Sequence, residues 1–321
     1  MCTVVSFLDH GSCFGRNMDT EGSFGEEVVI TPRHFSLSFR HMAKIETHYA
    51  LIGMAAVMDG YPLYADGMNE RGLCMAALNF VDNAYYFSPE AAATKRLAPY
   101  ELIPWVLATC ATVAEARRAL AGVTVVASPF RSDVPLSQLH WILSDRSGCL
   151  VVEPGEAGLA LYENPYGVLT NNPPFPCHRE NVRSYEGLTE NFLPSEPFFS
   201  YGTGAVGLPG DYSSPSRFVR AEFLRRCACR SGRMQPCDVY RILDAVASPR
   251  GCVRTEKGEY HYTTYSCCMD VSRSTYAYAT LAERQPTEVA LTPERCEGRL
   301  ILRFPIRHVS AKPCNESAHM L

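Results

Sequence analysis

The first two residues of the chain, Met1 and Cys2, could be the source of an active centre. Removal of Met1 would leave Cys2 with a free α-amino group and a thiol on the same residue. The thiolate form of cysteine is a strong nucleophile, and an α-amine, whose reference pKa is about 7.7–8.0, can accept and return a proton near neutral pH. Together they would place a nucleophile and a base on one residue. The alternative is that Cys2 is only the second residue of an edge strand.

A turn shortly after Cys2 is expected to fold the N-terminal segment into a hairpin. Residues 3–8 and 12–18 are rich in β-branched, aromatic and alternating apolar side chains, which is typical of strands. The three residues between them, Asp-His-Gly at 9–11, fit a three-residue hairpin loop that ends with Gly11 in the left-handed region. The length of this loop sets the register of the two strands.

In that register Cys2 lies opposite Met18, and Val4 lies opposite Arg16. Arg16 is then a diagonal neighbour of Cys2 on the same face, at about 7–8 Å between backbones, and its guanidinium would favour the thiolate. A two-residue turn would change which side chains face Cys2. The alternative for Arg16 is a solvated charge without a role. Asp19 falls on the opposite face of a straight strand, so it reaches the amine only if the strand bends after Met18.

The composition is typical of a soluble globular protein. Of 321 residues, 46% are hydrophobic and 20% are charged, the net charge is −4, and the basic residues are scattered, so no nucleic acid partner is expected. No apolar stretch approaches the roughly 18 residues of a membrane helix, and the N-terminus lacks the pattern of a secretory signal, so no membrane contact is expected either. We therefore expect a cytoplasmic protein. Because no repeat or linker divides the sequence, residues 2–321 are expected to form one domain.

The fourteen cysteines indicate neither disulfides nor a metal site. Four of them lie in apolar segments, where a free cysteine behaves as a small buried hydrophobe: Cys13, Cys74, Cys110 and Cys149. No two cysteines have the Cys-x-x-Cys spacing of a zinc site, and the close pairs at 227/229 and 267/268 are not followed by suitably spaced histidines. Ligand spacing is also missing from four histidines, which are interpreted as structural: His10, His34, His140 and His178. No metal is expected.

The rest of the sequence predicts strands and helices that are grouped in blocks. Helices are expected at residues 99–110, 112–121, 214–229 and 237–248. The second opens with the capping box Thr112-Val-Ala-Glu115, and the third with Ser214 as N-cap and Pro215 at the first helical position. Strands are expected at residues 26–31, 48–57, 72–80, 139–144, 149–153, 158–163, 167–170, 260–270, 274–281 and 300–304. With a long loop at 172–213, this order favours an α+β domain of packed sheets with helices outside.

Eight motifs occur in one order along the chain: MCT, FGRNMD, ADGMNERGL, LNF, LHWILSD, GVLTNNPPF, GLPGDYSSPSRFVR and YTTYSCC. Together they resemble the choloylglycine hydrolase family, most closely the bile salt hydrolases within it, from Cys2 to about Arg303. The resemblance implies the fold of the N-terminal nucleophile hydrolases, a four-layer αββα sandwich with two antiparallel sheets between helix layers. It also implies hydrolysis of an unbranched amide between an acyl group and an amino acid, without a cofactor.

The matching motifs imply roles for individual residues. The implied catalytic set is Cys2 as nucleophile, Arg16 as its charged neighbour, Asp19 as partner of the amine, Asn171 as oxyanion donor, Asn79 as a second oxyanion and substrate contact, and Arg217 as the remaining charged member. Arg217 would lie in the first turn of a helix, where its cation opposes the positive end of the helix dipole. The alternative is a surface arginine paired with an acid. The implied acyl pocket has apolar side chains that suit a rigid steroid: Met18, Met58, Ala65, Phe130 and Val134.

Within this family the sequence favours hydrolysis of glycine- or taurine-conjugated bile acids. Penicillin V acylases tend to carry tyrosine where this chain has Asn79, so penicillin V is the second hypothesis and an acyl-homoserine lactone the third. A protein that keeps the fold but only binds a small molecule is the alternative from another class. The family also implies a homotetramer. The segment between PPFPCHRE and GTGAVGLPGD, which contributes to that tetramer, is shorter here than in typical bile salt hydrolases.

Overall fold

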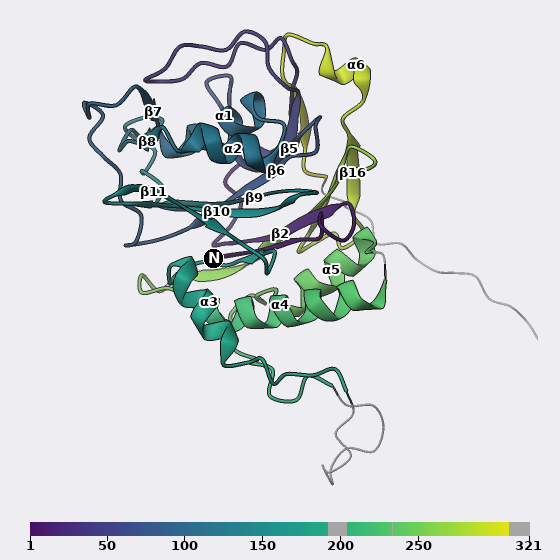
Figure 1. Ribbon diagram of the computed structural model, residues 1–321. Coiled ribbons are helices and arrows are strands. Elements are labelled where there is room, and N and C mark those ends of the chain that lie inside the picture. The colour runs from purple at the N-terminus through teal and green to yellow at the C-terminus, as the bar shows by residue number, and fades with distance from the viewer. Residues whose placement is uncertain (192–203, 233, 308–321) are drawn as a thin grey trace, which may run out of the picture.

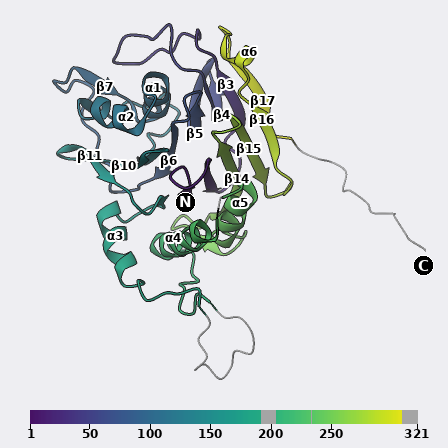
Figure 2. The ribbon, with the colours of Figure 1, turned by 45° about the vertical axis from the view of Figure 1, so that its right-hand side comes forward.

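The computed structural model describes residues 1–191, 204–232 and 234–307. Two antiparallel sheets lie between two groups of helices, and both views show these four layers (Figures 1 and 2). One sheet is covered by α1 (Leu102–Thr109) and α2 (Val113–Leu120), and the other by α4 (Ser214–Ser231) and α5 (Pro236–Ala245). Helix α3 (Phe175–Arg183) packs against α4. The expected α+β sandwich of αββα type is confirmed.

The first sheet carries the N-terminal residues, and its strands pair antiparallel. Its order is β12 (Val168–Leu169), β1 (Cys2–Ser6), β2 (Cys13–Thr20), β14 (Tyr260–Asp270), β15 (Thr275–Thr280) and β16 (Thr287–Ala290), with β13 (Val253–Arg254) paired to β14. Because β1 lies between β12 and β2, residues that follow β12 and residues of β2 both lie beside Cys2. This sheet therefore assembles the surroundings of the N-terminus.

The second sheet is also antiparallel. Its order is β11 (Gly158–Glu163), β10 (Gly148–Gly155), β9 (Leu139–Asp145), β6 (Cys74–Asn79), β5 (Tyr61–Asn69), β4 (Leu51–Met58), β3 (Glu26–Thr31) and β17 (Leu302–Pro305). The remaining elements are the parallel pair β7 (Lys95–Leu97) and β8 (Val123–Val125), the 3-10 helix η1 (Pro99–Glu101) and α6 (Pro293–Cys296). The helix expected at 99–110 is thus η1 followed by α1.

The N-terminal hairpin has the expected register, but its turn differs from the one expected. Strands β1 and β2 pair with Cys2 opposite Met18, which confirms the predicted pairing. Gly11, however, does not have a positive φ. The chain turns earlier, where the amide of His10 donates a hydrogen bond to the carbonyl of Phe7 at 3.1 Å. The register was therefore right although the conformation proposed for Gly11 was wrong.

Helix α4 begins one residue before the predicted position. Ser213, rather than Ser214, is the N-cap, and its hydroxyl accepts a hydrogen bond from the amide of Ser216. Pro215 is consequently the second helical residue instead of the first. Proline is tolerated at both positions because the first amides of a helix have no partner within it. The expectation for Ser214 as N-cap was therefore wrong by one residue.

Several elements lie where the sequence pattern indicates none, and two of them, β5 and α3, lie beside the site. Strand β5 contains Pro62 and a β-bulge at Ala65, so its apolar residues do not alternate regularly. Helix α3 lies within the stretch 172–213, which was expected to be loop throughout. The part of that stretch at 192–203 lies outside the described residues. Both elements carry residues that contact the site.

Two hydrophobic cores hold the layers together. The first fills the space between the sheets and continues beneath α4 and α5, and it contains Tyr265 and Tyr276 from the first sheet. The second lies between the second sheet and helices α1 and α2, with Trp141 fully buried at its centre. The site described below lies along the first of these cores, where charged and polar side chains are also buried.

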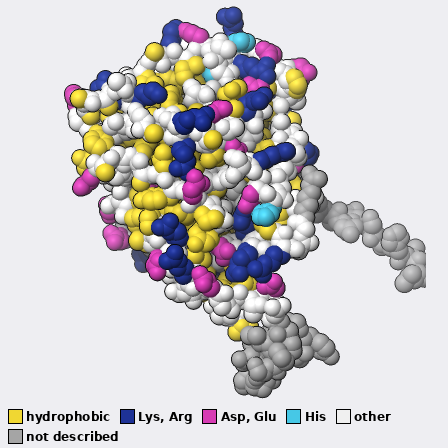
Figure 3. Space-filling model, in the orientation of Figure 1, with side chains coloured by type: hydrophobic (Ala, Val, Ile, Leu, Met, Phe, Trp, Pro, Cys, Tyr) yellow, Lys and Arg dark blue, Asp and Glu magenta, His cyan; other side chains and the backbone are white. Residues whose placement is uncertain are grey.

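The surface facing the viewer in Figure 3 carries both signs of charge. Lysine and arginine side chains are interspersed there with aspartate and glutamate, and apolar side chains lie between them. This distribution matches the scattered basic residues of the sequence. Across residues 1–191, 204–232 and 234–307, no helix combines the length and the apolar character needed to cross a membrane.

Candidate active site

Cys2 begins β1, and its thiol lies between a cation and a thioether. The N-terminus lies inside the fold (Figure 1), and Cys2 is only 2% exposed. Arg16, on β2, donates from Nη2 to the Cys2 Sγ at 3.0 Å, and the Met18 Sδ lies 3.6 Å from the same sulfur. The guanidinium is the cationic neighbour that the hairpin register predicts. A guanidinium in this position donates a charge-assisted hydrogen bond to the sulfur.

A buried carboxylate from the second sheet holds Arg16 in place. Asp66, on β5, accepts a hydrogen bond from Arg16 at 3.2 Å. It also accepts from the hydroxyls of Tyr265 and Tyr276 at 2.8 and 2.6 Å. Burial opposes the charge on Arg16, but the charges of Cys2 and the other neighbours outweigh it and raise the pKa of the guanidinium well above its usual value. Arg16 therefore stays protonated beside the thiol.

The β-bulge in β5 brings Asp66 to this position. The register between β4 and β5 shifts between Met54 and Ala55, which makes Ala65 an extra residue in β5. Such bulges change the direction of the side chains that follow them and are common beside active sites. Here Asp66 turns toward the space between the sheets, and the carbonyl of Ala65 accepts a hydrogen bond from Arg16 at 2.8 Å. Two adjacent residues at the bulge thus supply two acceptors to one guanidinium.

Asn171 follows β12, and its side chain lies against the backbone of Cys2. Its Oδ1 accepts from the amide of Cys2 at 2.7 Å and from Nη2 of Arg217 at 3.0 Å. Because both partners are donors, Nδ2 must be the opposite end of the amide group. Nδ2 donates one hydrogen to the carbonyl of Asn79 at 2.8 Å. Its second hydrogen can therefore serve a developing oxyanion.

Arg217 is fully buried and binds the backbone of Cys2 instead of its thiol. It lies in the first turn of α4, and its Nη1 donates to the carbonyl of Cys2 and to the hydroxyl of Thr3, both at 2.6 Å. Its Nε donates to the carbonyl of Tyr212 at 3.1 Å. Burial lowers the pKa of the Arg217 guanidinium, with the charge of Asp19 opposing that shift. Arg217 is therefore part of the site and not a surface charge.

Asp19 lies on the face of β2 opposite to Met18, as strand alternation requires. Its Oδ1 accepts from the hydroxyl of Thr263 at 2.6 Å, whereas its Oδ2 is buried and has no hydrogen-bond partner among the residues that the structure describes. The α-amino group of Met1 donates to the carbonyl of Asp19 at 2.6 Å. With Met1 in place the nitrogen of Cys2 is an amide, and it contacts Asn171 rather than the Asp19 carboxylate.

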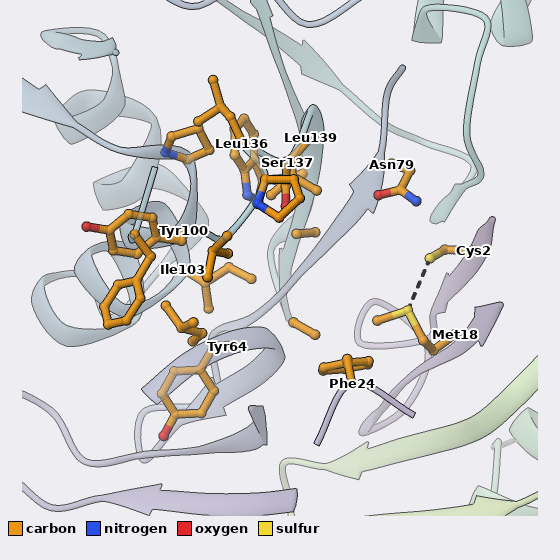
Figure 4. Close-up of a pocket in the computed structure, with 18 of the residues that line it drawn as sticks. Cys2, Met18, Phe24, Tyr64, Asn79, Tyr100, Ile103, Leu136, Ser137 and Leu139 are labelled. Atoms are coloured by element: carbon orange, nitrogen blue, oxygen red, sulfur yellow. Dashed lines mark hydrogen bonds between the residues drawn. The ribbon is translucent and has the colours of Figure 1, made fainter. Parts of the chain in front are cut away.

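An apolar cavity of about 260 Å³ leads to the thiol (Figure 4). Cys2, Met18 and Asn79 lie at one end of it, and Tyr64 and Tyr100 at the other. Four of the five expected pocket residues line this cavity: Met18, Ala65, Phe130 and Val134. The fifth, Met58 at the end of β4, is not among the lining residues. Aromatic and aliphatic side chains beyond those expected also line it: Phe24, Ile103, Leu136 and Leu139.

Comparison with known proteins identifies the family. Residues 2–300 match the family of linear amide C–N hydrolases, choloylglycine hydrolase family. The chain belongs to this family. It is 38% identical over 317 residues to the bile salt hydrolase/transferase of Lactiplantibacillus plantarum, covering 96% of this chain and 97% of that one. It is 35% identical over 317 residues to the protein of the same name from Clostridium perfringens, covering 95% and 96%.

Two solved structures share the fold of this chain. The crystal structure of a mutant of conjugated bile acid hydrolase from Clostridium perfringens superposes with a TM-score of 0.91 at 33% identity, covering 98% of this chain and all of that one. Penicillin V acylase from Agrobacterium tumefaciens superposes with a TM-score of 0.76 at 22% identity, covering 94% and 90%. The second likeness concerns the fold alone, which is that of the N-terminal nucleophile hydrolases.

As a choloylglycine hydrolase, the chain is an enzyme that acts on linear amides. The site contains the parts that amide cleavage by a cysteine needs: a thiol beside a protonated guanidinium, and an oriented amide N–H next to its backbone. Within the described parts of the chain, no three or more His, Cys, Asp or Glu side chains converge as a metal site would require.

Several residues around the site have no role in the sequence-based expectation. Asp66 lies within the motif ADGMNERGL and Tyr265 within YTTYSCC, but neither is assigned a function there. A carboxylate within an otherwise apolar stretch is a usable signal, because a buried charge needs a partner. His178, interpreted from the sequence as structural, lies against Asn171 with its Nε2 2.8 Å from the Asn171 carbonyl.

Replacing Asp66 by asparagine (Asp66→Asn) is expected to lower the free energy of unfolding by about 3–5 kcal/mol. The change keeps the shape of the side chain but removes the buried carboxylate charge that pairs with the fully buried Arg16. Urea denaturation followed by fluorescence measures the loss. The matched control is Asp59→Asn, because Asp59 forms an exposed ion pair with Arg131 and should cost about 0–1 kcal/mol. Equal losses in the two variants would contradict a stabilising role for the Asp66 charge.

Proposed function

We propose that the chain hydrolyses glycine- or taurine-conjugated bile acids, with Cys2 as nucleophile once Met1 has been removed. One observation carries the proposal: an apolar, aromatic-lined cavity ends at the Cys2 thiol, which is bound to Arg16. A rigid apolar acyl group suits such a cavity, and its amide would then lie at the sulfur. Support also comes from the relatives named bile salt hydrolase/transferase, which match almost the full chain.

In the first half of the proposed reaction, the Cys2 thiolate attacks the carbonyl carbon of the amide. A carbon–sulfur bond forms, and the negative charge moves to the carbonyl oxygen. The side chains of Asn171 and Asn79 donate hydrogen bonds to this oxyanion, and one such donor typically contributes about 10²–10³ in rate. The α-ammonium of Cys2 then protonates the leaving nitrogen. The carbon–nitrogen bond breaks, glycine or taurine leaves, and a thioester remains.

In the second half, water attacks the thioester. The α-amine of Cys2 accepts a proton from this water, the carbon–sulfur bond breaks, and the bile acid leaves as the thiolate is restored. The amine needs acceptors when it is charged. Asn171 Oδ1 already accepts from the nitrogen of Cys2, and the unpaired Oδ2 of Asp19 is a buried carboxylate oxygen on the neighbouring strand. We assign Asp19 to the charged amine on this basis.

Initial rates on glycocholate, taurocholate and penicillin V test the proposed function. The purified chain is first checked by mass spectrometry for an N-terminus at Cys2, because only that form has the free amine. Release of glycine or taurine should proceed with a higher kcat/KM than hydrolysis of penicillin V. Preference for penicillin V would assign the chain to the penicillin V acylases. Binding of the conjugates without any turnover, by protein that begins at Cys2, would make it a non-catalytic binder.

We also propose that the chain is one domain over residues 2–321, forms a homotetramer and resides in the cytoplasm. The continuous core between the sheets supports the single domain, and the resemblance to the family supports the tetramer. All cysteines among the described residues are free thiols, which suits a reducing compartment. Light scattering coupled to gel filtration should give a mass near four times 35.6 kDa. A mass near 35.6 kDa, that of a single chain, would contradict the tetramer.

A further inference from the structure

Two buried histidines bind the carbonyl groups of two consecutive residues, Thr170 and Asn171. Strand β12 ends at Leu169, so the next two residues lack the hydrogen bonds of a sheet. His140 Nε2 lies 2.9 Å from the carbonyl of Thr170, and His178 Nε2 lies 2.8 Å from the carbonyl of Asn171. Both imidazoles are fully buried. Consecutive carbonyls that a sheet would otherwise pair are thus each held by a histidine.

We propose that His178 is a positioning residue for the oxyanion donor Asn171, assisted by His140 on the preceding carbonyl. The inference deepens the proposed function, because it rests on the role assigned there to Asn171. A donor must lie close to the place where the oxyanion forms, and small displacements reduce its effect strongly. The side-chain amide of Asn171 is fixed by Cys2 and Arg217, and its main chain is fixed by His178.

The chemistry of His178 is suited to one hydrogen bond only. A carbonyl oxygen accepts but cannot donate, so Nε2 must carry the proton in this contact. Burial lowers the pKa of His178 to about 4, so the imidazole is neutral near pH 7 and its Nδ1 carries no proton. Nδ1 is buried and has no hydrogen-bond partner in the described part of the chain. An unpaired buried acceptor is destabilising, and a phenylalanine would avoid it.

The surroundings of His178 connect it to the rest of the site. Its ring stacks on Phe218 of α4 with centroids 4.8 Å apart and an interplanar angle of 13°. Phe218 directly follows Arg217, which donates to the side chain of Asn171. Helices α3 and α4, which lie side by side in Figure 1, therefore hold the two ends of the same residue. A shift of either helix would move the donor.

His140 binds the other carbonyl from the second sheet. It lies on β9, stacks on Phe80 with centroids 4.3 Å apart, and has its Nδ1 3.2 Å from Oε1 of Glu153. The same Glu153 oxygen accepts from the amide of Phe175, the first residue of α3. This network joins β9, β10 and α3 around the peptide between Thr170 and Asn171. It supports the position of the donor without contacting substrate.

The test compares His178→Phe with His178→Gln. Phenylalanine keeps the ring and its stacking but removes the N–H, whereas glutamine can return an N–H to the Asn171 carbonyl. We expect kcat on glycocholate to fall about 10- to 100-fold in His178→Phe, with KM within about 3-fold, and to recover in part in His178→Gln. Alkylation of Cys2 by iodoacetamide should stay within about 2-fold of the wild-type rate, because that reaction forms no oxyanion.

The matched control is His48→Phe. His48 is also buried, with its ring nitrogens 2.7 and 2.9 Å from the carbonyls of Tyr49 and Phe35, but it lies outside the site. Its replacement should lower the melting temperature and leave kcat unchanged. A structural role for His178 predicts the same pattern in His178→Phe. An unchanged kcat there, or a fall in kcat accompanied by an equal fall in Cys2 alkylation, would overturn the proposal.

A second measurement needs no substrate and so separates this inference from the proposed function. The side-chain amide resonance of Asn171, identified by its loss in Asn171→Ala, reports the position of the donor in ¹⁵N NMR spectra. It should shift in His178→Phe and stay in place in His48→Phe. Lack of turnover in the wild-type chain would overturn the proposed function alone. An unshifted Asn171 resonance in His178→Phe would overturn the positioning role whatever the substrate is.

Discussion

Replacing Cys2 by serine (Cys2→Ser) is expected to lower kcat by roughly 10⁴-fold or more, because the proposed nucleophile is lost. A hydroxyl is a far weaker acid and a poorer nucleophile than a thiol, and the hydrogen bond from Arg16, which reaches the sulfur at 3.0 Å, does not make up for that difference. The fold should persist, since the exchange is nearly isosteric and the backbone bonds of Cys2 to Asn171 and Arg217 do not involve the sulfur. Release of glycine from glycocholate measures the effect.

The control for this variant is a second cysteine changed in the same way. Cys252→Ser alters an exposed thiol outside the site and should keep wild-type turnover. Circular dichroism and the melting temperature should show both variants folded. Turnover by folded Cys2→Ser above about 1% of wild type would rule out Cys2 as the nucleophile.

A chain with one alanine inserted between Met1 and Cys2 is expected to lose about 10²- to 10⁴-fold in kcat, the usual contribution of a general acid–base group. After removal of the methionine, the free amine belongs to the alanine, and the nitrogen of Cys2 remains an amide that cannot shuttle protons. The loss should be chemical and not steric. The structure contains a residue before Cys2, whose amine binds the carbonyl of Asp19 at 2.6 Å and lies 3.4 Å from His261.

Cys2 alkylation and the melting temperature distinguish a chemical cause of the loss in the inserted chain from a steric one. Iodoacetamide should still alkylate Cys2, because Arg16 remains beside the sulfur, and the melting temperature should stay near that of the wild type. Mass spectrometry should show that the wild-type chain begins at Cys2 and the inserted chain at alanine. Wild-type activity in the inserted chain would show that the α-amine of Cys2 takes no part in the reaction.

The contacts of Cys2 with residues close to it in sequence could be predicted. Cys2 and Arg16 share a face because strand alternation and the loop length set their register, and both are properties of residues 2–18. The predicted register was right although the predicted conformation of Gly11 was wrong, because the register depends on the number of loop residues and not on the conformation of one of them. The motifs also indicated the family and its fold, which the match over residues 2–300 bears out.

Elements with irregular patterns were harder to predict. Helix α3 buries Phe175, His178 and Val182, which have helical spacing, but a surrounding stretch rich in Pro, Gly and Ser obscures it. In β5 the bulge at Ala65 interrupts the alternation that would have indicated a strand. Both elements place residues in or beside the site where the regular pattern fails. Asp66 is available to Arg16 because of that interruption.

The sequence by itself determined the family and the pairing that puts Cys2 and Arg16 on one face, because both depend on residue identity and on the register of a short segment. Only the tertiary structure decided which side chains bind Arg16 and Asn171. Asp66 meets Arg16 across the two sheets, and Arg217 and His178 meet Asn171 from two helices. The physical reason is that these contacts depend on how whole layers dock. That docking follows from burying the apolar faces of both sheets and their helices at once, which no local pattern encodes.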